Sequence, residues 1–344
     1  MLVDATRSPV TAPKPEFYAA TAKYGRSSTV KAVWQLANTL IPYAGLWALM
    51  IRLVQGGAPY WITLALSVVA SGFLVRLFIL FHDCCHGAFF NSRRANSIIG
   101  NLLGILAFTP FAEWRRQHSI HHATAGDLDR RGTGDIPTLT VEEYRAASQW
   151  GKLAYRLTRN PYLMCLVGPT FVFLIIPRFP YRGARKRERV GVMLTNLGIA
   201  AMVGAFSLGI GFRAYLAIQL PVILIAGAAG VWLFYIQHQF EGVYWARHQT
   251  WDLIRVAMQG SSYYKLPKVL QWFTASIGLH HIHHLRPRIP NYNLQRCYDE
   301  FPVLQAVKPV TLRGSLKSLR LNLWDERQGK LVSFRSLKAD PAAG

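Results

Sequence analysis

Cysteine and acidic residues are both scarce in this chain of 344 residues. Its four cysteines include no Cys-x-x-Cys pair, and two of them, Cys84 and Cys85, are adjacent. That pattern argues against a disulfide scaffold and against a zinc site built from thiolates, and it fits a reducing compartment. Only 17 acidic residues stand against 39 lysines and arginines, so the formal net charge is +22.

This basic charge lies between long apolar runs, and hydrophobic residues make up 51% of the chain. A basic nucleic-acid-binding protein would carry its charge on polar, lysine-rich faces, so we expect no nucleic-acid partner. Basic loops between apolar runs are typical of a membrane protein with its positive loops in the cytoplasm. The first 31 residues contain no apolar core followed by a small-residue cleavage site, so we expect no removable signal peptide.

Four apolar stretches are long enough to cross a bilayer, since a span needs about 20 residues. They are residues 33–53, 60–81, 191–212 and 214–236. Arg76, the single charge inside the second stretch, is expected to extend toward the lipid headgroups. Two shorter apolar segments, residues 97–112 and 161–177, contain or adjoin proline. We expect neither segment to cross the membrane. Four crossings by the longer stretches alone keep the histidine motifs and the basic loops on one side.

The predicted fold is an all-α integral membrane protein. It has four transmembrane helices, two non-crossing apolar helices and a cytoplasmic helical cap that carries a histidine-rich metal site. Residues 1–31 are expected to form a flexible cytoplasmic tail, residues 32–310 the membrane domain, and residues 311–344 a cytoplasmic C-terminal tail. Both termini and all of the histidines then lie on the cytoplasmic side.

Nine of the eleven histidines fall in three short motifs, at residues 82–86, 118–122 and 280–284. On a helix, residues three or four apart share one face, so each motif is expected to direct its imidazoles to a single point. The candidate ligands are His82, His86, His118, His121, His122, His280, His283 and His284. Many imidazoles without a set of cysteines suit a transition metal such as iron, zinc or copper. The alternative is a set of unrelated structural histidines.

The motifs and their flanking residues resemble those of the membrane fatty acid desaturase family. The matching stretches are HDCCHGAFFNSRRAN, WRRQHSIHHATAGDLDRRGTGD, FYIQHQFEGVYW and GSSYYKLPKVLQWFTASIGLHHIHHLRPRIPNYNL. They are similar to bacterial acyl-lipid desaturases of the delta-12 (omega-6) type, over most of residues 30–310. The resemblance implies a di-iron centre with two Fe per chain, O2 as co-substrate, and dehydrogenation of an acyl CH2–CH2 pair to a cis double bond. It also implies a bacterial inner-membrane enzyme with a cytoplasmic active site, an acyl-lipid substrate and a separate electron donor such as ferredoxin.

Members of this family use a further histidine between the second and third motifs, and His238 matches it by position. The alternative for His238 is a histidine whose hydrogen bonds are satisfied at the membrane interface. Some relatives place a water-bridging asparagine one helical turn earlier, where this chain has Phe234.

Several other polar residues are candidates for orienting a ligand imidazole through its second ring nitrogen. They are Asp83, Asp127 and His281, together with Asp129, Asp135 and Glu241. For the carboxylates the alternative is loop capping or ion pairing. His281 lies off the helical face that its neighbours share, and His248 is expected at the surface.

Two other functions compete with desaturation. The nearest is a fatty acyl or carotenoid hydroxylase or ketolase of the same di-iron superfamily, which shares the histidine motifs. The second is a histidine-rich membrane metal transporter, which would need ionisable residues inside its spans. Relatives with different regiochemistry share the motifs, so the position of the double bond depends on the resemblance alone.

Overall fold

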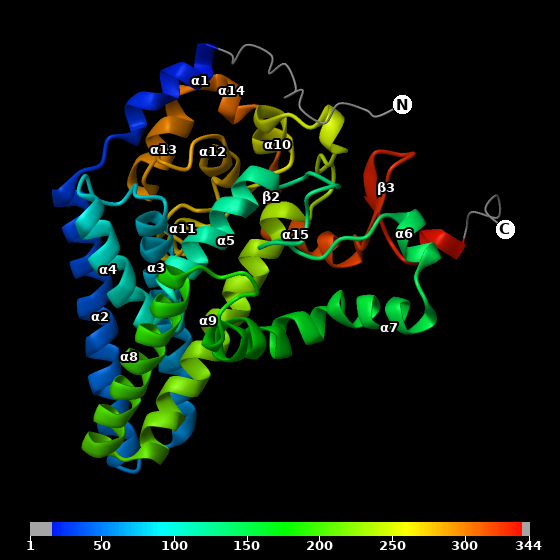
Figure 1. The fold of residues 1–344 in the computed structure, drawn as a ribbon. Helices are drawn as coiled ribbons and strands as arrows, with labels where there is room; N and C mark the ends of the chain where they lie inside the picture. Colours follow the sequence, from blue (N-terminus) through cyan, green and yellow to red (C-terminus); the bar gives the residue numbers. More distant parts are fainter. Residues whose placement is uncertain (1–15, 339–344) are drawn as a thin grey trace.

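Four long helices form the main bundle of the molecule (Figure 1). The computed structural model describes residues 16–338. The four helices are α2 (Thr29–Gln55), α3 (Tyr60–Cys85), α8 (Lys186–Ile210) and α9 (Phe212–His238). Each is long and apolar enough to cross a membrane, as the sequence predicts. α2 begins earlier than predicted because Ser28 caps it, its hydroxyl accepting the Lys31 N–H.

α3 is the most buried of the four helices and packs against both α2 and α9. The Ser71 hydroxyl of α3 donates to the Val222 carbonyl of α9 at 2.9 Å. α8 and α9 are separated only by Gly211, whose φ of 86° favours glycine. As a result α3 and α9 end side by side, and each delivers a histidine, His82 or His238, to the same end of the bundle.

Arg76 corrects an expectation about the second span. Its side chain does not extend outward but is buried, with 3% exposure. Its Nε donates to the Thr39 hydroxyl at 3.0 Å, and its guanidinium donates to the Trp272 carbonyl and lies 4.1 Å from the Trp272 ring. α11 (Lys268–Phe273) packs against α3 and so supplies the polar partners that the headgroups were expected to supply.

The two shorter apolar segments form bent helix pairs. α4 (Arg93–Leu106) and α5 (Phe111–Thr124) meet at 101°. α7 (Gln149–Thr158) meets residues Leu163–Arg178 at 65°, and this second pair lies across the axes of the four long helices (Figure 1). Residues Leu163–Arg178 consist of η2 (Leu163–Val167), η3 (Thr170–Ile175) and η4 (Ile176–Arg178). By length and composition each pair also fits one broken span or a re-entrant loop, so the absence of a crossing stays a prediction.

Short helices cover the end of the bundle at which α3 and α9 finish (Figure 1). They include α10 (Leu253–Gln259), α12 (His280–Leu285), α13 (Asn291–Glu300), α14 (Pro302–Gln305) and α15 (Leu312–Ser315). Smaller pieces are α6 (Val141–Ala146), η5 (His248–Thr250), η6 (Leu316–Arg320) and η7 (Ser336–Lys338). α6 begins with a capping box, in which Thr140 and Glu143 satisfy each other's backbone N–H groups.

Two small sheets correct the prediction that the fold is entirely α-helical. β1 (Tyr263–Lys265) pairs in parallel with β2 (Pro309–Thr311), and β3 (Leu323–Asp325) pairs antiparallel with β4 (Lys330–Val332). Tyrosine, valine and threonine in these short segments favour extended backbone. Leu323 and Trp324 are buried, so the described part of the predicted C-terminal tail is packed on the molecule. Residues 339–344 lie outside the described residues.

The N-terminal segment also differs from the flexible tail that the sequence predicts. Residues 1–15 lie outside the described residues, but α1 (Glu16–Ala20) and η1 (Thr21–Gly25) follow them. Tyr24 is buried, packs edge-on against Phe301 and donates a hydrogen bond to Glu300. Burial of an aromatic ring against α13 and α14 therefore holds this segment in place.

We predict that Gly104→Ala destabilises the fold at the bend between α4 and α5. A Cβ at this position would lie 2.4 Å from the Thr109 carbonyl oxygen, a backbone atom that cannot move freely. Overpacking of this kind costs about 1–3 kcal/mol. Thermal unfolding of the purified protein in detergent measures the effect. The control is Gly204→Ala in α8, where a Cβ meets no atom within 4 Å. Equal stability of the two variants would contradict the close approach at Gly104.

Candidate metal centre

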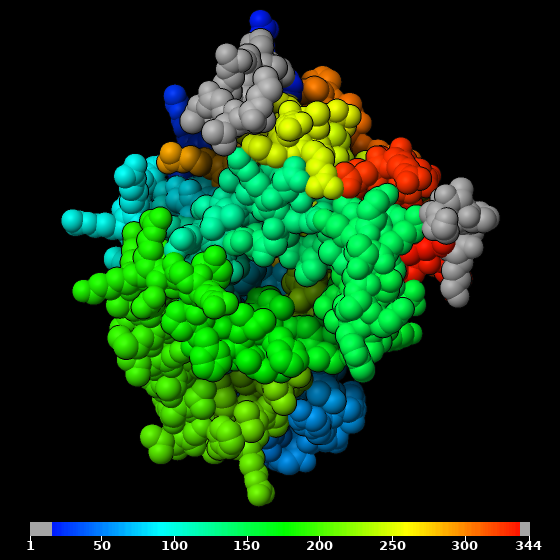
Figure 2. Space-filling view, turned by 45° about the vertical axis from the view of Figure 1, so that its right-hand side comes forward, coloured from blue at the N-terminus to red at the C-terminus, as the bar shows by residue number. Residues whose placement is uncertain are grey.

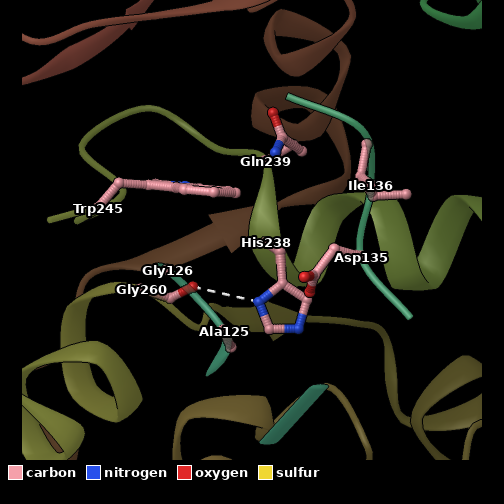
Figure 3. Close-up of a pocket in the computed structure, with 8 residues that line it drawn as sticks. All are labelled: Ala125, Gly126, Asp135, Ile136, His238, Gln239, Trp245 and Gly260. Carbon is pink, nitrogen blue, oxygen red and sulfur yellow. Dashed lines mark hydrogen bonds between the residues drawn. The ribbon is translucent and has the colours of Figure 1, made fainter. Parts of the chain in front are cut away.

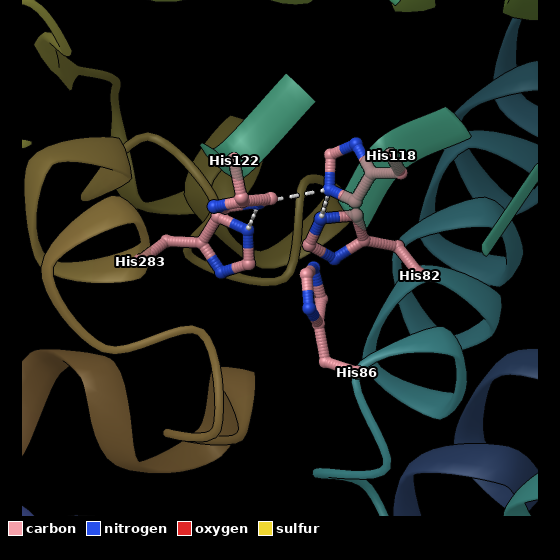
Figure 4. Close-up of side chains that lie close together, drawn as sticks. All are labelled: His82, His86, His118, His122 and His283. Atoms are coloured by element: carbon pink, nitrogen blue, oxygen red, sulfur yellow. Dashed lines mark hydrogen bonds between the residues drawn. The ribbon is translucent and has the colours of Figure 1, made fainter. Parts of the chain in front are cut away.

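All nine candidate histidines gather in two neighbouring clusters at the end of the bundle. The five-histidine cluster contains His82, His86, His118, His122 and His283, whose rings face one another in Figure 4. The four-histidine cluster contains His121, His238, His280 and His284. Within each cluster, one ring nitrogen from every residue lies within 4.8 Å of the others. Four separate elements, α3, α5, α9 and α12, thus supply the rings.

The second and third motifs are each divided between the two clusters, which corrects the expectation that each converges on one point. The i, i+4 pairs His118/His122 and His280/His284 each stay together. His121 and His283 instead join the opposite cluster. Residues four apart differ by about 40° around a helix axis, whereas adjacent residues differ by about 100°. α5 and α12 therefore each contribute to both clusters, and the rings of His122 and His284 stack at 4.1 Å where the clusters meet.

The separations between ring nitrogens fit metal coordination. In the five-histidine cluster, His118 Nε2 lies 2.9 Å from His82 Nε2 and 3.0 Å from His122 Nε2. In the other cluster, His238 Nε2 lies 3.1 Å from His121 Nε2 and 3.1 Å from His280 Nε2. Two ligands with bonds of about 2.1 Å are about 3.0 Å apart at right angles and about 3.4 Å apart in a tetrahedron. These pairs lie within the range that two ligands of one ion span, while other ring nitrogens of each cluster lie up to 4.8 Å apart.

The outer nitrogens of three histidines contact oxygen acceptors. His121 Nδ1–H donates to Asp135 Oδ1 at 2.6 Å, and His238 Nδ1–H donates to the Gly260 carbonyl at 3.3 Å. His82 Nδ1 lies 3.4 Å from Asp83 Oδ1 without forming a hydrogen bond. A proton held on the outer nitrogen leaves the lone pair of Nε2 directed inward, as metal binding requires.

Asp83 is itself fixed by the start of α13. Its Oδ2 accepts the Asn291 backbone N–H at 2.7 Å and the Asn291 side-chain amide at 2.9 Å. The same amide group exchanges hydrogen bonds with Gln35 of α2. The carboxylate at a helix N-terminus is electrostatically favoured. Sequence reasoning found Asp83 but missed Asn291, because nothing in the sequence places residue 291 beside residue 83.

Burial favours the neutral imidazole at His118 and at His283. His118, His121, His238 and His283 are buried, with His283 at 0% exposure. Burial, followed by the neighbouring imidazoles, lowers the pKa of His118 and of His283 far below the ordinary histidine value. Because a protonated imidazole has no free lone pair, the lowered pKa favours the form that binds a metal.

Asp127 and His281 do not contact either cluster in the way the sequence predicts. Asp127 Oδ2 accepts the Nδ1–H of His248 at 2.8 Å, so this carboxylate orients a histidine that is not a candidate ligand. His281 is fully buried, and its Nε2–H donates to the Leu304 carbonyl at 3.2 Å. Burial lowers the pKa of His281 to about 4. Of Asp129, Asp135 and Glu241, only Asp135 accepts a hydrogen bond from a cluster histidine within the described residues.

The remaining sequence candidates lie at the surface or in ion pairs. Asp129 accepts hydrogen bonds from Arg247 at 2.7 Å and from the His248 backbone at 2.9 Å. Glu241 is exposed and lies 3.6 Å from Lys317. His248 is half-buried rather than exposed, because it lies between Asp127 and Arg130. These contacts fit the alternative of ion pairing and loop capping.

A small pocket borders the four-histidine cluster on its outer side (Figure 3). His238 and Asp135 contribute its polar edge, next to the Gly260 carbonyl. Its lining consists of Ala125, Gly126, Asp135, Ile136, His238, Gln239, Trp245 and Gly260. The Gln239 amide is engaged elsewhere, since it donates to Thr138 and accepts from Arg159. The pocket therefore presents Asp135 and Gly260 as its main acceptors.

Comparison with known proteins points to one family. A family model described as fatty acid desaturase matches residues 58–308. A fatty acid desaturase of Bacillus subtilis is 49% identical over 94% of this chain and 91% of the relative. Two Synechocystis proteins are more distant. An sn-1 acyl-lipid omega-3 desaturase (ferredoxin) is 26% identical over 68% of this chain and 64% of its own length, and an sn-1 oleoyl-lipid 12-desaturase is 25% identical over 68% and 67%.

We predict that Asp135→Asn weakens metal retention, because the amide no longer accepts the His121 Nδ1–H as strongly as the carboxylate does. Loss of such a supporting hydrogen bond lowers metal affinity about 10–100-fold. Metal content after dialysis against graded chelator measures the change. The matched control is Asp127→Asn, a buried carboxylate on the same loop that contacts His248 instead. If both variants lose metal equally, Asp135 has no special role at the cluster.

Proposed function

This chain belongs to the fatty acid desaturase family, a family of oxidoreductases, and from that premise we propose that it introduces a cis double bond into an acyl chain of a membrane lipid. The observation that carries the proposal is the pair of adjacent histidine clusters, one with five imidazoles and the other with four. Two clusters favour two metal ions per chain. An all-imidazole donor set suits iron, zinc or copper, and we assign iron because the chain belongs to the fatty acid desaturase family.

Each ion has a set of residues to hold it. We assign His82, His86, His118, His122 and His283 to one iron, and His121, His238, His280 and His284 to the other. When bound, the iron pair would use O2 and two external electrons to oxidise an unactivated CH2–CH2 pair. The balanced reaction is –CH2–CH2– + O2 + 2 e⁻ + 2 H⁺ giving –CH=CH– + 2 H2O.

The protein's own residues orient the ligand imidazoles and exclude bulk water from the site. Asp135 and the Gly260 carbonyl hold the imidazoles of His121 and His238 in one tautomer and orientation. Such fixed ligands keep the reacting groups in register without reorganisation during the reaction. Burial of the histidines limits access by bulk water, which protects a strong oxidant from side reactions.

The proposed setting is the bacterial inner membrane, with the histidine clusters and both termini on the cytoplasmic side. The basic run at the start of α8 supports this orientation, because Arg182, Arg185, Lys186 and Arg187 are all exposed. Electrons are proposed to arrive from a separate carrier such as ferredoxin, which the name of one cyanobacterial relative contains. The cyanobacterial 12-desaturases among the relatives support a delta-12 (omega-6) position for the new double bond.

The lipid profile of a bacterial host tests this function. We expect expression of the chain to convert an existing monoene into a diene, because a delta-12 enzyme adds a second double bond to a monounsaturated chain. Gas chromatography with double-bond localisation measures the product. A new monoene would still identify the chain as a desaturase, but one that places the double bond at a different position in the acyl chain. A hydroxylated or keto product would contradict desaturation and would favour the hydroxylase or ketolase alternative of the same superfamily.

His121→Ala provides the variant that links the product to the site. We expect it to abolish the new fatty acid, since His121 belongs to the four-histidine cluster and donates a hydrogen bond to Asp135. Membrane insertion should persist, because His121 lies on α5 and outside the four long helices. Full desaturation by this variant would refute the site assignment.

Metal analysis tests the two clusters separately. We expect about two iron ions per purified wild-type chain, and about one in a His86→Ala or a His280→Ala variant, because each removes a ligand from one cluster only. Elemental analysis with iron and zinc measured on the same samples gives the result. Zinc at two ions per chain in active enzyme would overturn the assignment of iron.

A further inference from the structure

Arg159 is a buried arginine without an acidic partner among the described residues. It directly follows α7, its side chain is only 4% exposed, and none of the ion pairs of the described residues includes it. All four acceptors of its N–H groups are neutral oxygens. Burial of a charge without a counterion is costly, so the positions of these acceptors have to account for an arginine here.

The guanidinium of Arg159 joins three segments that lie far apart in the chain. Its Nη1 donates to the Pro137 carbonyl at 3.3 Å. Its Nη2 donates to Gln239 Oε1 at 2.9 Å and to the Leu321 carbonyl at 2.7 Å. The N–H groups of a guanidinium point in fixed and divergent directions, so one side chain reaches acceptors on several segments at once.

Two of these segments carry parts of the four-histidine cluster. Pro137 comes two residues after Asp135, whose carboxylate accepts the His121 Nδ1–H. Gln239 directly follows His238, and His238 and Asp135 line the same pocket in Figure 3. The guanidinium therefore connects the carboxylate support of one cluster histidine to the backbone beside another cluster histidine.

A further hydrogen bond closes the connection between these two segments. The Gln239 side chain donates from Nε2 to the Thr138 hydroxyl at 2.9 Å, while its Oε1 accepts from Arg159. Gln239 is 0% exposed and Thr138 is 3% exposed. Because both ends of the buried amide are hydrogen-bonded, the amide has one orientation and the spacing between the two segments is fixed.

The third segment belongs to the C-terminal part of the chain. The Tyr235 hydroxyl of α9 donates to the Ser318 carbonyl at 2.9 Å, and the Arg159 guanidinium lies 5.2 Å from the Tyr235 ring. In Figure 2 the C-terminal segment (red) lies against the green segment that contains α6, and α6 contacts β3. Together with the Leu321 carbonyl, these contacts fix the C-terminal segment on the end of α9.

The five-histidine cluster has no corresponding connection. Its histidines belong to α3, α5 and α12 or directly follow α3. Within the described residues, no hydrogen bond of Arg159 goes to any of these three helices. The support that this arginine provides is therefore confined to one of the two clusters.

Resting on the two-ion assignment of the proposed function, we propose that Arg159 is a positioning residue for the four-histidine cluster. It holds the segment that carries Asp135 against the end of α9, and so fixes the relative positions of His121 and His238. Without the guanidinium, Gln239 Oε1 and two backbone carbonyls would lose a donor in a buried site. The segment and the helix end would then separate, and the two histidines would lose the spacing that metal binding requires.

Metal retention in variants with one cluster disabled tests the proposal. Arg159→Met removes the guanidinium but keeps a long side chain, and it is combined with His86→Ala or with His280→Ala, each of which leaves one cluster intact. In the His86→Ala background we expect Arg159→Met to weaken retention of the remaining iron about 10–100-fold, the range for partners that support metal ligands. In the His280→Ala background we expect no change. Iron content after dialysis against graded chelator gives both results.

The matched control is Arg156→Met on α7. Arg156 is exposed, and its Nε donates to the Tyr144 hydroxyl, away from the segments that Arg159 joins. We expect this variant to retain iron in both backgrounds.

Thr138→Val is a milder second variant, which answers the question if Arg159→Met fails to fold. It removes the acceptor of the Gln239 amide and leaves Arg159 in place. We expect a smaller loss of iron than with Arg159→Met, and only in the His86→Ala background.

The outcomes separate this proposal from the proposed function. Equal loss of iron in the two backgrounds would indicate a general loosening of the fold and would overturn the role of Arg159, as would full retention in both. If wild type forms an unsaturated fatty acid but the loss of iron is not selective, the desaturase function stands and the role of Arg159 fails. If wild type forms no such product with iron and an electron donor present, the proposed function fails, and selective loss of iron still supports the role of Arg159.

Discussion

The rest of the structure depends on holding nine imidazoles together inside the protein. A buried imidazole that lacks a partner for its ring nitrogens is costly, so such a group needs a metal or hydrogen bonds. The structure supplies outer acceptors for His121 and His238, from Asp135 and the Gly260 carbonyl. The Nδ1 atoms of His82, His122, His280 and His283 have no hydrogen-bond partner among the described residues. On the inner side the Nε2 atoms face one another at 2.9 to 3.1 Å. A metal in each cluster would satisfy all of these lone pairs at once.

This requirement explains the arrangement of the helices. α3 and α9 are long apolar helices that both end in histidines, so the apolar bundle carries the site at one end. α5 and α12 are short, and each contributes rings to both clusters. Asn291 at the start of α13 fixes Asp83 and joins the covering helices to α2 through Gln35. Arg76 makes a similar connection from α3 to α11. Hydrogen bonds of Asn291 and Arg76 thus attach the short helices α13 and α11 to the apolar bundle.

Aromatic rings on α5 and α9 pack directly on the histidine clusters. Trp114 of α5 stacks on His118 at 4.3 Å, and Phe234 of α9 lies 5.5 Å from His238. Residues 163–178 lie across the bundle rather than along it and pack on the α9 backbone at Gly227. Because the rings and the histidines belong to the same two helices, a shift of either helix would move both.

The sequence by itself determined the four long helices and the membership of the histidine set, because apolar length and helical spacing are local properties that survive without tertiary information. It named Asp83 and Asp135 among the acidic candidates but did not distinguish Asp135 from Asp127, Asp129 or Glu241. Only the tertiary structure decided how the second and third motifs divide between two clusters, since this depends on where α5 and α12 pass between two centres. The ordered N-terminal segment, the two small sheets, the burial of Arg76 and the pairing of Asp83 with Asn291 likewise depend on contacts between residues far apart in the chain. No local pattern specifies such contacts, because they arise from packing of the whole molecule.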